Sequence, residues 1–241
     1  MIHKARIHKA MLLAAGRGTR MGELTQEMPK PMLPLNGRPM IEHIVRRLRE
    51  AGLRDILIVV GYRRQLIEDH FRAGFSGVSF VVQEVVEGTA SAVKLGRDFV
   101  GNEPFLLTFG DIICDASNYS GIAGELERNS AAAAIGVKYA DDPWQGAAVY
   151  ADEDGAVRKM IEKPARGTSS THWNSAGLYA FRPEIFDEIA RAPKSPRGEY
   201  EITTAIEQLI EKGRPVRMFE MSGAWRDVGR PEDLAEANRI V

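Results

Sequence analysis

The stretch LAAGRGTRMGELTQEMPKPM, residues 13–32, decides the fold, because it joins a short apolar run to a glycine-rich loop. Residues 10–15 (AMLLAA) predict a buried strand that stops at Gly16. Glycines after a strand let the backbone approach a phosphate group, with several N–H groups pointing inward. The spacing of Gly16, Gly18 and Gly22 differs from that of a dinucleotide-binding loop, and no Gly-Lys-Ser/Thr follows as in a P-loop. The glycines alone are equally consistent with an ordinary tight turn.

Basic residues in the same stretch favour a phosphate site over a plain turn. Arg20 and Lys30 both lie in the loop, and a triphosphate needs cationic partners that offset the charge developing on the leaving pyrophosphate. Pro29 and Pro31 restrict the backbone on either side of Lys30, which would aim its ammonium group. The sequence therefore predicts a triphosphate-binding loop.

Strand and helix patterns alternate outward from this loop. They predict an α/β protein, a Rossmann-like three-layer α/β/α sandwich whose mostly parallel sheet gains antiparallel strands in the second half. Ligands of such sheets bind beyond the carboxyl ends of the strands, and Asp111 falls at such an end. We expect one catalytic domain over residues 1–241. The further predicted strands are 55–60, 78–82, 104–109, 132–138, 147–150, 156–161, 177–181 and 215–220. The predicted helices are 39–52, 65–71, 89–99, 119–129, 202–212 and 231–240. The predicted loops are 165–171, 192–198 and 225–229.

The composition excludes several classes of protein. Hydrophobic residues make up 44% of the chain and charged residues 27%, as in soluble globular proteins. Lys plus Arg (32) nearly balance Asp plus Glu (33), so no broad basic face for nucleic acid is expected. The single Cys114 excludes an intramolecular disulfide framework and a zinc site of several thiolates, which fits a reducing cytoplasm. Because the sequence lacks a run of about 18 apolar residues, no membrane span is expected.

Residues 16–20 (GRGTR) followed by residues 29–31 (PKP) resemble the signature of the nucleotidyltransferases that make nucleotide sugars. That family includes glucose-1-phosphate thymidylyltransferases and related uridylyl- and guanylyltransferases. Further family motifs follow in order, so the resemblance spans residues 13–231. It implies the nucleotide-diphospho-sugar transferase (GT-A-like) fold, with the nucleotide bound by residues 10–115 and the sugar phosphate by residues 116–241.

The resemblance also implies roles for residues of the nucleotide half. Arg20 would contact the β- and γ-phosphates, and Lys30 would neutralise phosphate charge around the reacting centre. Residues 83–90 (QEVVEGTA) are similar to the family's base-reading segment, whose glutamine amide both donates and accepts and so suits a pyrimidine edge. A polar strand end is the alternative for Gln83. The predicted nucleotide-binding residues are Ala14, Ala15, Gly16, Gly18, Thr19, Gln83, Gly88 and Thr89, and the predicted catalytic residues are Arg20, Lys30 and Lys163.

Two carboxylates, Asp111 in FGD and Asp227 in WRDVGRP, resemble the family's Mg²⁺ ligands. Mg²⁺ prefers hard oxygen ligands and takes one or two carboxylates together with phosphate oxygens and water. Taken alone, either aspartate is more typical of a turn or a helix cap. The five histidines show no metal-ligand spacing, so Mg²⁺ is the one cofactor predicted.

Residues 162–164 (EKP), 174–179 (NSAGLY) and 199–203 (EYEIT) resemble the family's sugar-phosphate segments. In the family, the acid of the first segment bonds sugar hydroxyls and its lysine contacts the sugar phosphate. A surface ion pair is the alternative for the first segment, and a helix cap is the alternative for the last. The predicted sugar-phosphate-binding residues are Glu162, Lys163, Asn174, Gly177 and Glu201.

These features predict a Mg²⁺-dependent nucleotidylyltransferase that condenses a nucleoside triphosphate, with dTTP or UTP favoured, with a sugar 1-phosphate by in-line displacement. A guanylyltransferase acting on mannose or heptose 1-phosphate is one alternative. A cytidylyltransferase acting on phosphocholine is another, if Trp144, Trp173 and Trp225 converge into an aromatic cage. A third is a non-catalytic nucleotide-sugar sensor on the same fold. The sequence leaves open the base, the sugar and whether the chain forms a homo-oligomer.

Overall fold

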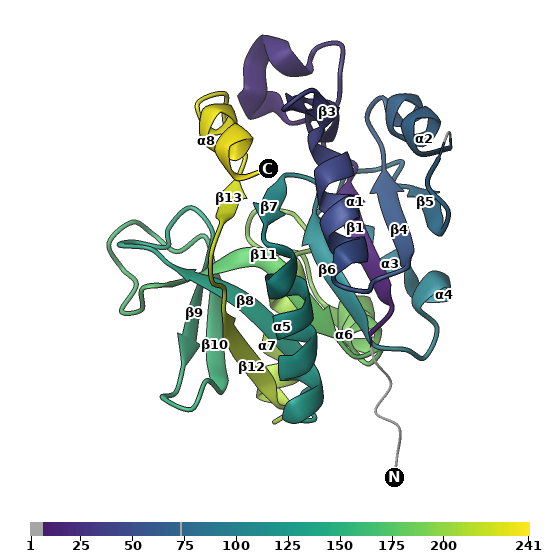
Figure 1. Cartoon of the computed structure of the whole chain (residues 1–241). Coiled ribbons are helices and arrows are strands. Elements are labelled where there is room, and N and C mark those ends of the chain that lie inside the picture. The colour runs from purple at the N-terminus through teal and green to yellow at the C-terminus, as the bar shows by residue number, and fades with distance from the viewer. Residues whose placement is uncertain (1–6, 73) are drawn as a thin grey trace.

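A central β-sheet organises the protein, whose computed structural model describes residues 7–72 and 74–241 (Figure 1). Nine strands form this sheet, in the order β10-β9-β11-β6-β1-β4-β5, with β8 and β12 joined through β11. Strand β1 (Lys9–Ala14) pairs in parallel with β4 (Asp55–Val60) and β6 (Phe105–Phe109), and β4 pairs in parallel with β5 (Val78–Val82). Because β1, β4 and β6 are covered on both faces, they are continuous apolar runs rather than alternating ones.

The second half of the chain extends the sheet with antiparallel strands. Strand β11 (Trp173–Phe181) runs antiparallel to β6 and also pairs with β8 (Ala133–Tyr139) and β9 (Ala147–Ala151). Strand β10 (Val157–Glu162) closes a hairpin with β9, and β12 (Val216–Glu220) runs parallel to β8. The predicted mixed α/β sheet is therefore confirmed.

Helices cover both faces of the sheet, and an apolar core lies beneath each layer. One core takes its helical residues from α1, α2, α5 and α8, and the other from α3, α4, α6 and α7. This gives the predicted three layers. The helices are α1 (Met40–Glu50), α2 (Arg64–Arg72), α3 (Thr89–Lys94), α4 (Arg97–Val100), α5 (Ala116–Arg128), α6 (Ile185–Arg191), α7 (Ile202–Glu211) and α8 (Asp233–Ile240), with 3₁₀ turns at Thr19–Thr25 and Lys30–Met32 and a small hairpin of β2 (Pro34–Leu35) and β3 (Arg38–Pro39).

The prediction of one helix over 89–99 is wrong, because the chain forms the two short helices α3 and α4 there. The break falls at Gly96, which packs against Met11 of β1. A Cβ atom on Gly96 would lie 2.0 Å from the Met11 Cε atom. Close approach of the backbone to the sheet therefore ends α3, and the sequence periodicity carries no sign of it.

Several short elements differ from the sequence-based expectation, including the unpredicted β2–β3 hairpin. The predicted loop 225–229 contains strand β13 (Trp225–Asp227), which pairs antiparallel with β7 (Ile112–Cys114). Helix α6 was not predicted at all. These differences arise because short elements carry little periodicity and are stabilised by tertiary contacts.

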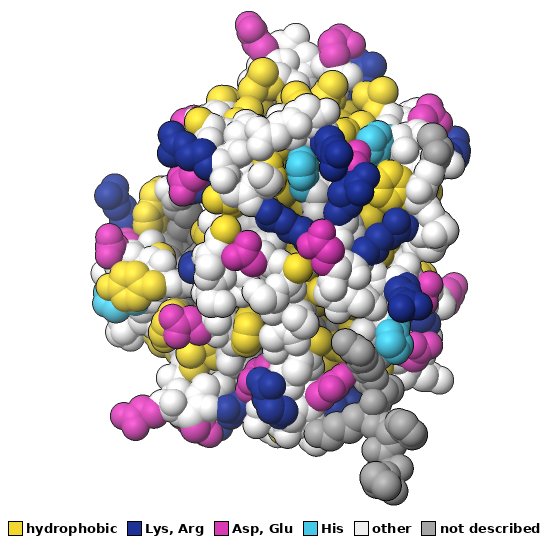
Figure 2. All heavy atoms as spheres, viewed as in Figure 1, with side chains coloured by type: hydrophobic (Ala, Val, Ile, Leu, Met, Phe, Trp, Pro, Cys, Tyr) yellow, Lys and Arg dark blue, Asp and Glu magenta, His cyan; other side chains and the backbone are white. Residues whose placement is uncertain are grey.

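The surface mixes charges of both signs. On the face shown in Figure 2, basic and histidine side chains gather over α1 and α2, and acidic side chains lie among them. Among the residues described by the structure, no helix is both long enough and apolar enough to cross a bilayer.

Candidate active site

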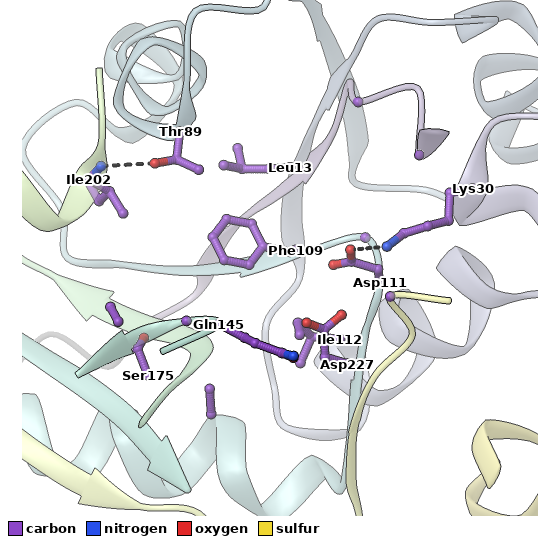
Figure 3. A pocket seen from close by; sticks show the side chains of 18 of the residues that line it. Leu13, Lys30, Thr89, Phe109, Asp111, Ile112, Gln145, Ser175, Ile202 and Asp227 are labelled. Atoms are coloured by element: carbon purple, nitrogen blue, oxygen red, sulfur yellow. Dashed lines mark hydrogen bonds and ion pairs between the residues drawn. The ribbon is translucent and has the colours of Figure 1, made fainter. Parts of the chain in front are cut away.

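A cavity of about 850 Å³ opens beyond the carboxyl ends of β1 and β6, and residues from both halves of the chain line it (Figure 3). This position agrees with the rule for open α/β sheets. Thr19 is exposed and is not one of the lining residues. Every other predicted site residue lines the cavity, namely Ala14, Ala15, Gly16, Gly18, Arg20, Lys30, Gln83, Gly88, Thr89, Asp111, Glu162, Lys163, Asn174, Gly177, Glu201 and Asp227.

The loop after β1 brings Lys30 into the cavity. Lys30 begins a 3₁₀ turn between two prolines, its side chain is 9% exposed, and its ammonium group forms an ion pair with Asp111. Gly18 lies beneath it with a φ of +70°, and a Cβ at Gly18 would lie 2.7 Å from the Lys30 Cβ. Only glycine fits this conformation and this approach. The absence of a side chain at Gly18 therefore allows Lys30 to occupy its position in the cavity.

The two aspartates meet through the β7–β13 ribbon. Asp227 pairs with Ile112 in the ribbon, and the Val228 N–H donates to the Asp111 carbonyl at 2.9 Å. Burial and the charge of Asp111 raise the pKa of Asp227 to about 6, although Lys30 and Arg20 act in the opposite direction.

The donor set fits Mg²⁺. Two hard carboxylates that repel each other gain stability from a divalent cation, and Mg²⁺ characteristically leaves its other positions to phosphate oxygens and water. Within residues 7–72 and 74–241, no group of three or more His, Cys, Asp or Glu side chains could hold a metal ion. The remaining ligands of a cation at Asp111 and Asp227 would therefore come from substrate and solvent.

Gln83 is 7% exposed and its amide orientation is fixed by its neighbours. The Gln83 Nε2 atom donates to Ser91 Oγ at 3.0 Å and to the Gly88 carbonyl at 3.4 Å, while Ser91 Oγ itself donates to that carbonyl at 2.7 Å. Because a carbonyl only accepts, the amide nitrogen must face Gly88. The Gln83 oxygen is then the atom left to accept a hydrogen bond from a ligand.

The opposite wall of the cavity carries three glutamates and one arginine. Arg197 Nη1 lies 2.9 Å from Glu201 Oε1 and 3.7 Å from Glu162 Oε1, and Nη2 lies 3.7 Å from Glu199 Oε2. Burial and the charge of Glu201 raise the pKa of Glu162 above its ordinary value. The Thr203 hydroxyl donates to Glu162 Oε2 at 3.2 Å. These acceptor oxygens could receive hydrogen bonds from several hydroxyl groups.

Lys163 and Asn174 adjoin that wall. Lys163 has a φ of +43°, and its N–H donates to the Gly146 carbonyl at 2.7 Å. The Asn174 Oδ1 atom is buried without a hydrogen-bond partner in the described residues. Gly177 has a φ of +72°, and a Cβ atom there would lie 2.9 Å from side-chain atoms of Phe109 and Ile112. Both features favour glycine at this position. An unpaired buried oxygen beside a lysine suits a polar ligand.

Sequence reasoning missed several residues that line the cavity. Arg197 lies in the predicted loop 192–198, close in sequence to Glu199 and Glu201, but its approach to Glu162 of β10 is a tertiary contact. Gln145 lies in the turn before β9, and Figure 3 shows its side chain extending into the cavity. Only the folded sheet could reveal these residues. Other lining residues to which the sequence analysis gave no role include Gly146, Phe109, Tyr179, Arg226 and Arg230.

The three tryptophans do not converge. Among the described residues, Trp225 is the one tryptophan that lines the cavity, and its indole N–H donates to the Ala176 carbonyl. Trp144 lies under the Arg166 guanidinium, and Trp173 packs edge-on against Tyr139. The aromatic cage required by the phosphocholine alternative is therefore not formed by these side chains.

Cys114 is a packed residue of the core. It is fully buried at the end of β7, and burial raises the pKa of its thiol to about 11. A thiol of this kind stays protonated and is a poor nucleophile.

Comparisons with known proteins find relatives described as nucleotidyltransferases. The low-salt glycan biosynthesis nucleotidyltransferase Agl11 of Haloferax volcanii is 33% identical over 238 residues, which cover 97% of this chain and 66% of Agl11. The bifunctional protein GlmU of Methanocaldococcus jannaschii is 34% identical over 96% of this chain and 54% of GlmU, so the chain spans only part of these relatives. The UTP–glucose-1-phosphate uridylyltransferase AglF of Haloferax volcanii is 34% identical over 96% of this chain and 95% of AglF.

A solved structure and a family model complete the comparison. A UDP-glucose pyrophosphorylase in complex with UDP-glucose superposes with a TM-score of 0.89 at 24% identity, over 97% of each chain, which confirms the fold. Residues 9–241 match the family model described as nucleotidyl transferase. The match of this model to nearly the whole chain, together with the 34% identity to AglF over nearly its full length, shows that the chain belongs to the nucleotidyl transferase family.

Proposed function

We propose that this chain is a sugar-1-phosphate nucleotidylyltransferase that uses UTP or dTTP and a hexose 1-phosphate and releases pyrophosphate. One observation carries the proposal: a single cavity joins the Lys30–Asp111 pair and Asp227, the Gln83 amide, and the acidic wall around Glu162. These are the groups that a triphosphate with its cation, a base and a sugar would each need. The similarity to AglF over nearly the full length of both chains supports the same activity.

The orientation of Gln83 supports the choice of base. The amide oxygen is free to accept, because the nitrogen is engaged by Ser91 and Gly88. Uracil, thymine and guanine present a ring N–H donor on their pairing edge, whereas the matching ring atom of cytosine is an acceptor. Acceptor facing acceptor is unfavourable. UTP, dTTP or GTP is therefore preferred over CTP, and the similarity to AglF favours UTP.

The reaction is a direct displacement. A phosphate oxygen of the sugar 1-phosphate attacks the α-phosphorus, a new P–O bond forms, and the bond to the β-phosphate oxygen breaks, so that pyrophosphate leaves. Because the nucleophile is already an anion, no general base is required. Lys30 and Arg20 offset charge on the phosphates, and Lys163 orients the sugar phosphate. A Mg²⁺ ion held by Asp111 and Asp227 would supply further charge neutralisation.

Pyrophosphate release tests this proposal. Purified protein with Mg²⁺ is assayed over a matrix of UTP, dTTP, GTP, CTP and ATP against glucose, N-acetylglucosamine and mannose 1-phosphates and phosphocholine. Release that requires UTP or dTTP and one hexose 1-phosphate supports the proposal and identifies both substrates.

Other outcomes separate the alternatives. Turnover only with GTP and mannose 1-phosphate would replace the base assignment and keep the reaction class. Turnover only with CTP and phosphocholine would overturn the sugar assignment. We do not expect this outcome, because the three tryptophans do not form an aromatic cage. Nucleotide-sugar binding without any turnover would favour a sensor.

A further inference from the structure

Arg47 of α1 holds two carbonyl groups that lie far apart in the sequence. Its side chain is half-buried, and its Nη1 atom donates to the Cys114 carbonyl at 3.1 Å. Its Nη2 atom donates to the Ile240 carbonyl. None of the carboxylates in the described residues forms a salt bridge with Arg47. The guanidinium is therefore committed to the backbone of two other segments.

Both segments lead directly to the paired aspartates. Cys114 ends β7, the strand that follows Asp111, and Ile240 ends α8, the helix that follows Asp227 and its loop. Figure 1 shows the C-terminal end of the chain beside β7 and α1. Ile240 also offers one of the unpaired carbonyls at the negative end of the α8 dipole, where an arginine is favoured. Arg47 thus ties the flanks of both aspartates to a third element.

Further contacts hold the ribbon at its start and connect its end to α8. The Ala224 N–H donates to Asp115 Oδ2 at 2.9 Å, and the Asp115 N–H donates to the Ala224 carbonyl at 3.1 Å. After Asp227, Val228 is buried, and the N–H groups of Gly229 and Arg230 donate to Asp233 Oδ2 at 3.0 and 2.8 Å, so the position of α8 is coupled to that of Asp227. Only three residues of β13 pair with β7, and a ribbon of this length is weak by itself.

Two carboxylates held close together repel each other in the absence of a cation. A short ribbon under that repulsion needs an anchor on each flank if the pair is to stay at the spacing that a cation requires. Arg47 supplies such an anchor, because it contacts the end of β7 and the end of α8 at once.

We propose that Arg47 is a positioning residue for a divalent-cation site at Asp111 and Asp227, acting through the ends of β7 and α8 and touching neither carboxylate. The inference rests on the cation site of the proposed function. It goes beyond that function by naming a residue of α1, outside every motif of the sequence, on which cation affinity depends.

Titration with Mn²⁺ alone, followed by electron paramagnetic resonance, tests the proposal. Arg47→Ala should bind Mn²⁺ about tenfold or more weakly than the wild type, which is the usual size of effect for residues that support metal ligands. Arg49→Ala is the matched control, because Arg49 lies on the same helix and also donates to a backbone carbonyl, that of Ser76, away from the ribbon. Arg47→Lys keeps the charge but cannot span both carbonyls, so an intermediate affinity is expected. Residues 222–229 should exchange amide hydrogens faster in Arg47→Ala and not in Arg49→Ala.

Unchanged Mn²⁺ affinity and unchanged exchange over residues 222–229 in Arg47→Ala would overturn the proposal, whatever its melting temperature. If Arg47→Ala does not fold, Arg47→Lys decides: wild-type affinity in this variant would equally overturn it. A wild-type protein that binds Mn²⁺ but turns over no sugar phosphate would contradict the proposed function and leave the role of Arg47 standing. A wild-type protein that binds no Mn²⁺ would contradict the cation site and this inference together.

Discussion

Lys30 forms an ion pair with Asp111 across the mouth of the phosphate loop, and the lysine side chain is only 9% exposed. The pair joins the loop after β1 to the loop after β6, which are neighbouring strands of the sheet. In the proposed function, a triphosphate carrying its cation would offer phosphate oxygens to Lys30 and a metal to Asp111, so each charge would exchange one partner for another.

Replacing Lys30 tests the lysine side of that exchange. Lys30→Ala should lower kcat for pyrophosphate release by about 10²–10³-fold, because a charged donor aimed at the developing negative charge is lost. Lys159→Ala is the control, since Lys159 is exposed and lies over the Tyr150 ring outside the cavity. A Lys30→Ala enzyme with wild-type kcat would show that the ion pair serves stability alone.

Replacing Asp227 separates function from stability. Asp227→Asn removes the repulsion with Asp111 that burial intensifies, so the protein without metal should be at least as stable as the wild type by thermal unfolding. Activity should nevertheless fall by about 10²-fold or more, because a cation ligand is lost. A lower melting temperature together with full activity would be the opposite result and would make Asp227 a structural residue.

Gln83 is expected to act on the nucleotide alone. Gln83→Ala should lower kcat/KM for the triphosphate by roughly 10–100-fold, matching about 1–3 kcal/mol for a hydrogen bond lost in a buried place. The KM for the sugar phosphate should not change. Ser91→Ala, which removes the hydroxyl that holds the amide, should have a smaller effect in the same direction. An equal loss for both substrates would indicate a general disturbance of the cavity.

Glu42 should make stability depend on pH. The carboxyl is 6% exposed, and burial would raise its pKa, but hydrogen bonds and charge from Arg46 at 2.7 Å and His70 at 2.9 Å prevail and lower the pKa below 4.5. A lowered pKa means that the stabilisation is present above the unfolded-state value and is lost as the pH falls through the folded-state value. Urea unfolding at neutral pH should therefore show Glu42→Gln to be less stable by about 1–2 kcal/mol. The free energies of unfolding of the wild type and Glu42→Gln should converge at acid pH, well below the folded-state pKa of Glu42. A difference that stayed constant with pH would contradict an ionic origin of the stabilisation.

Patterns within the sequence predicted much of the fold and of the site. The apolar runs of β1, β4 and β6 were recognisable because both faces of these strands are buried. Lys30 was recognisable because two prolines flank it and glycines precede it. Features that depend only on residues within one short segment can therefore be predicted from the residue types of that segment.

The tertiary structure decided the features that depend on contacts between distant segments of the chain. The break at Gly96 depends on Met11, the three-residue strand β13 depends on β7, and Arg197 meets Glu162 only when two distant segments fold together. Thus the sequence by itself determined the α/β class, the glycine-rich loop after the first strand and the identity of the charged residues. The folded sheet decided which of those charges face each other and at what spacing, since contacts between distant segments have no period in the sequence and depend on packing as a whole.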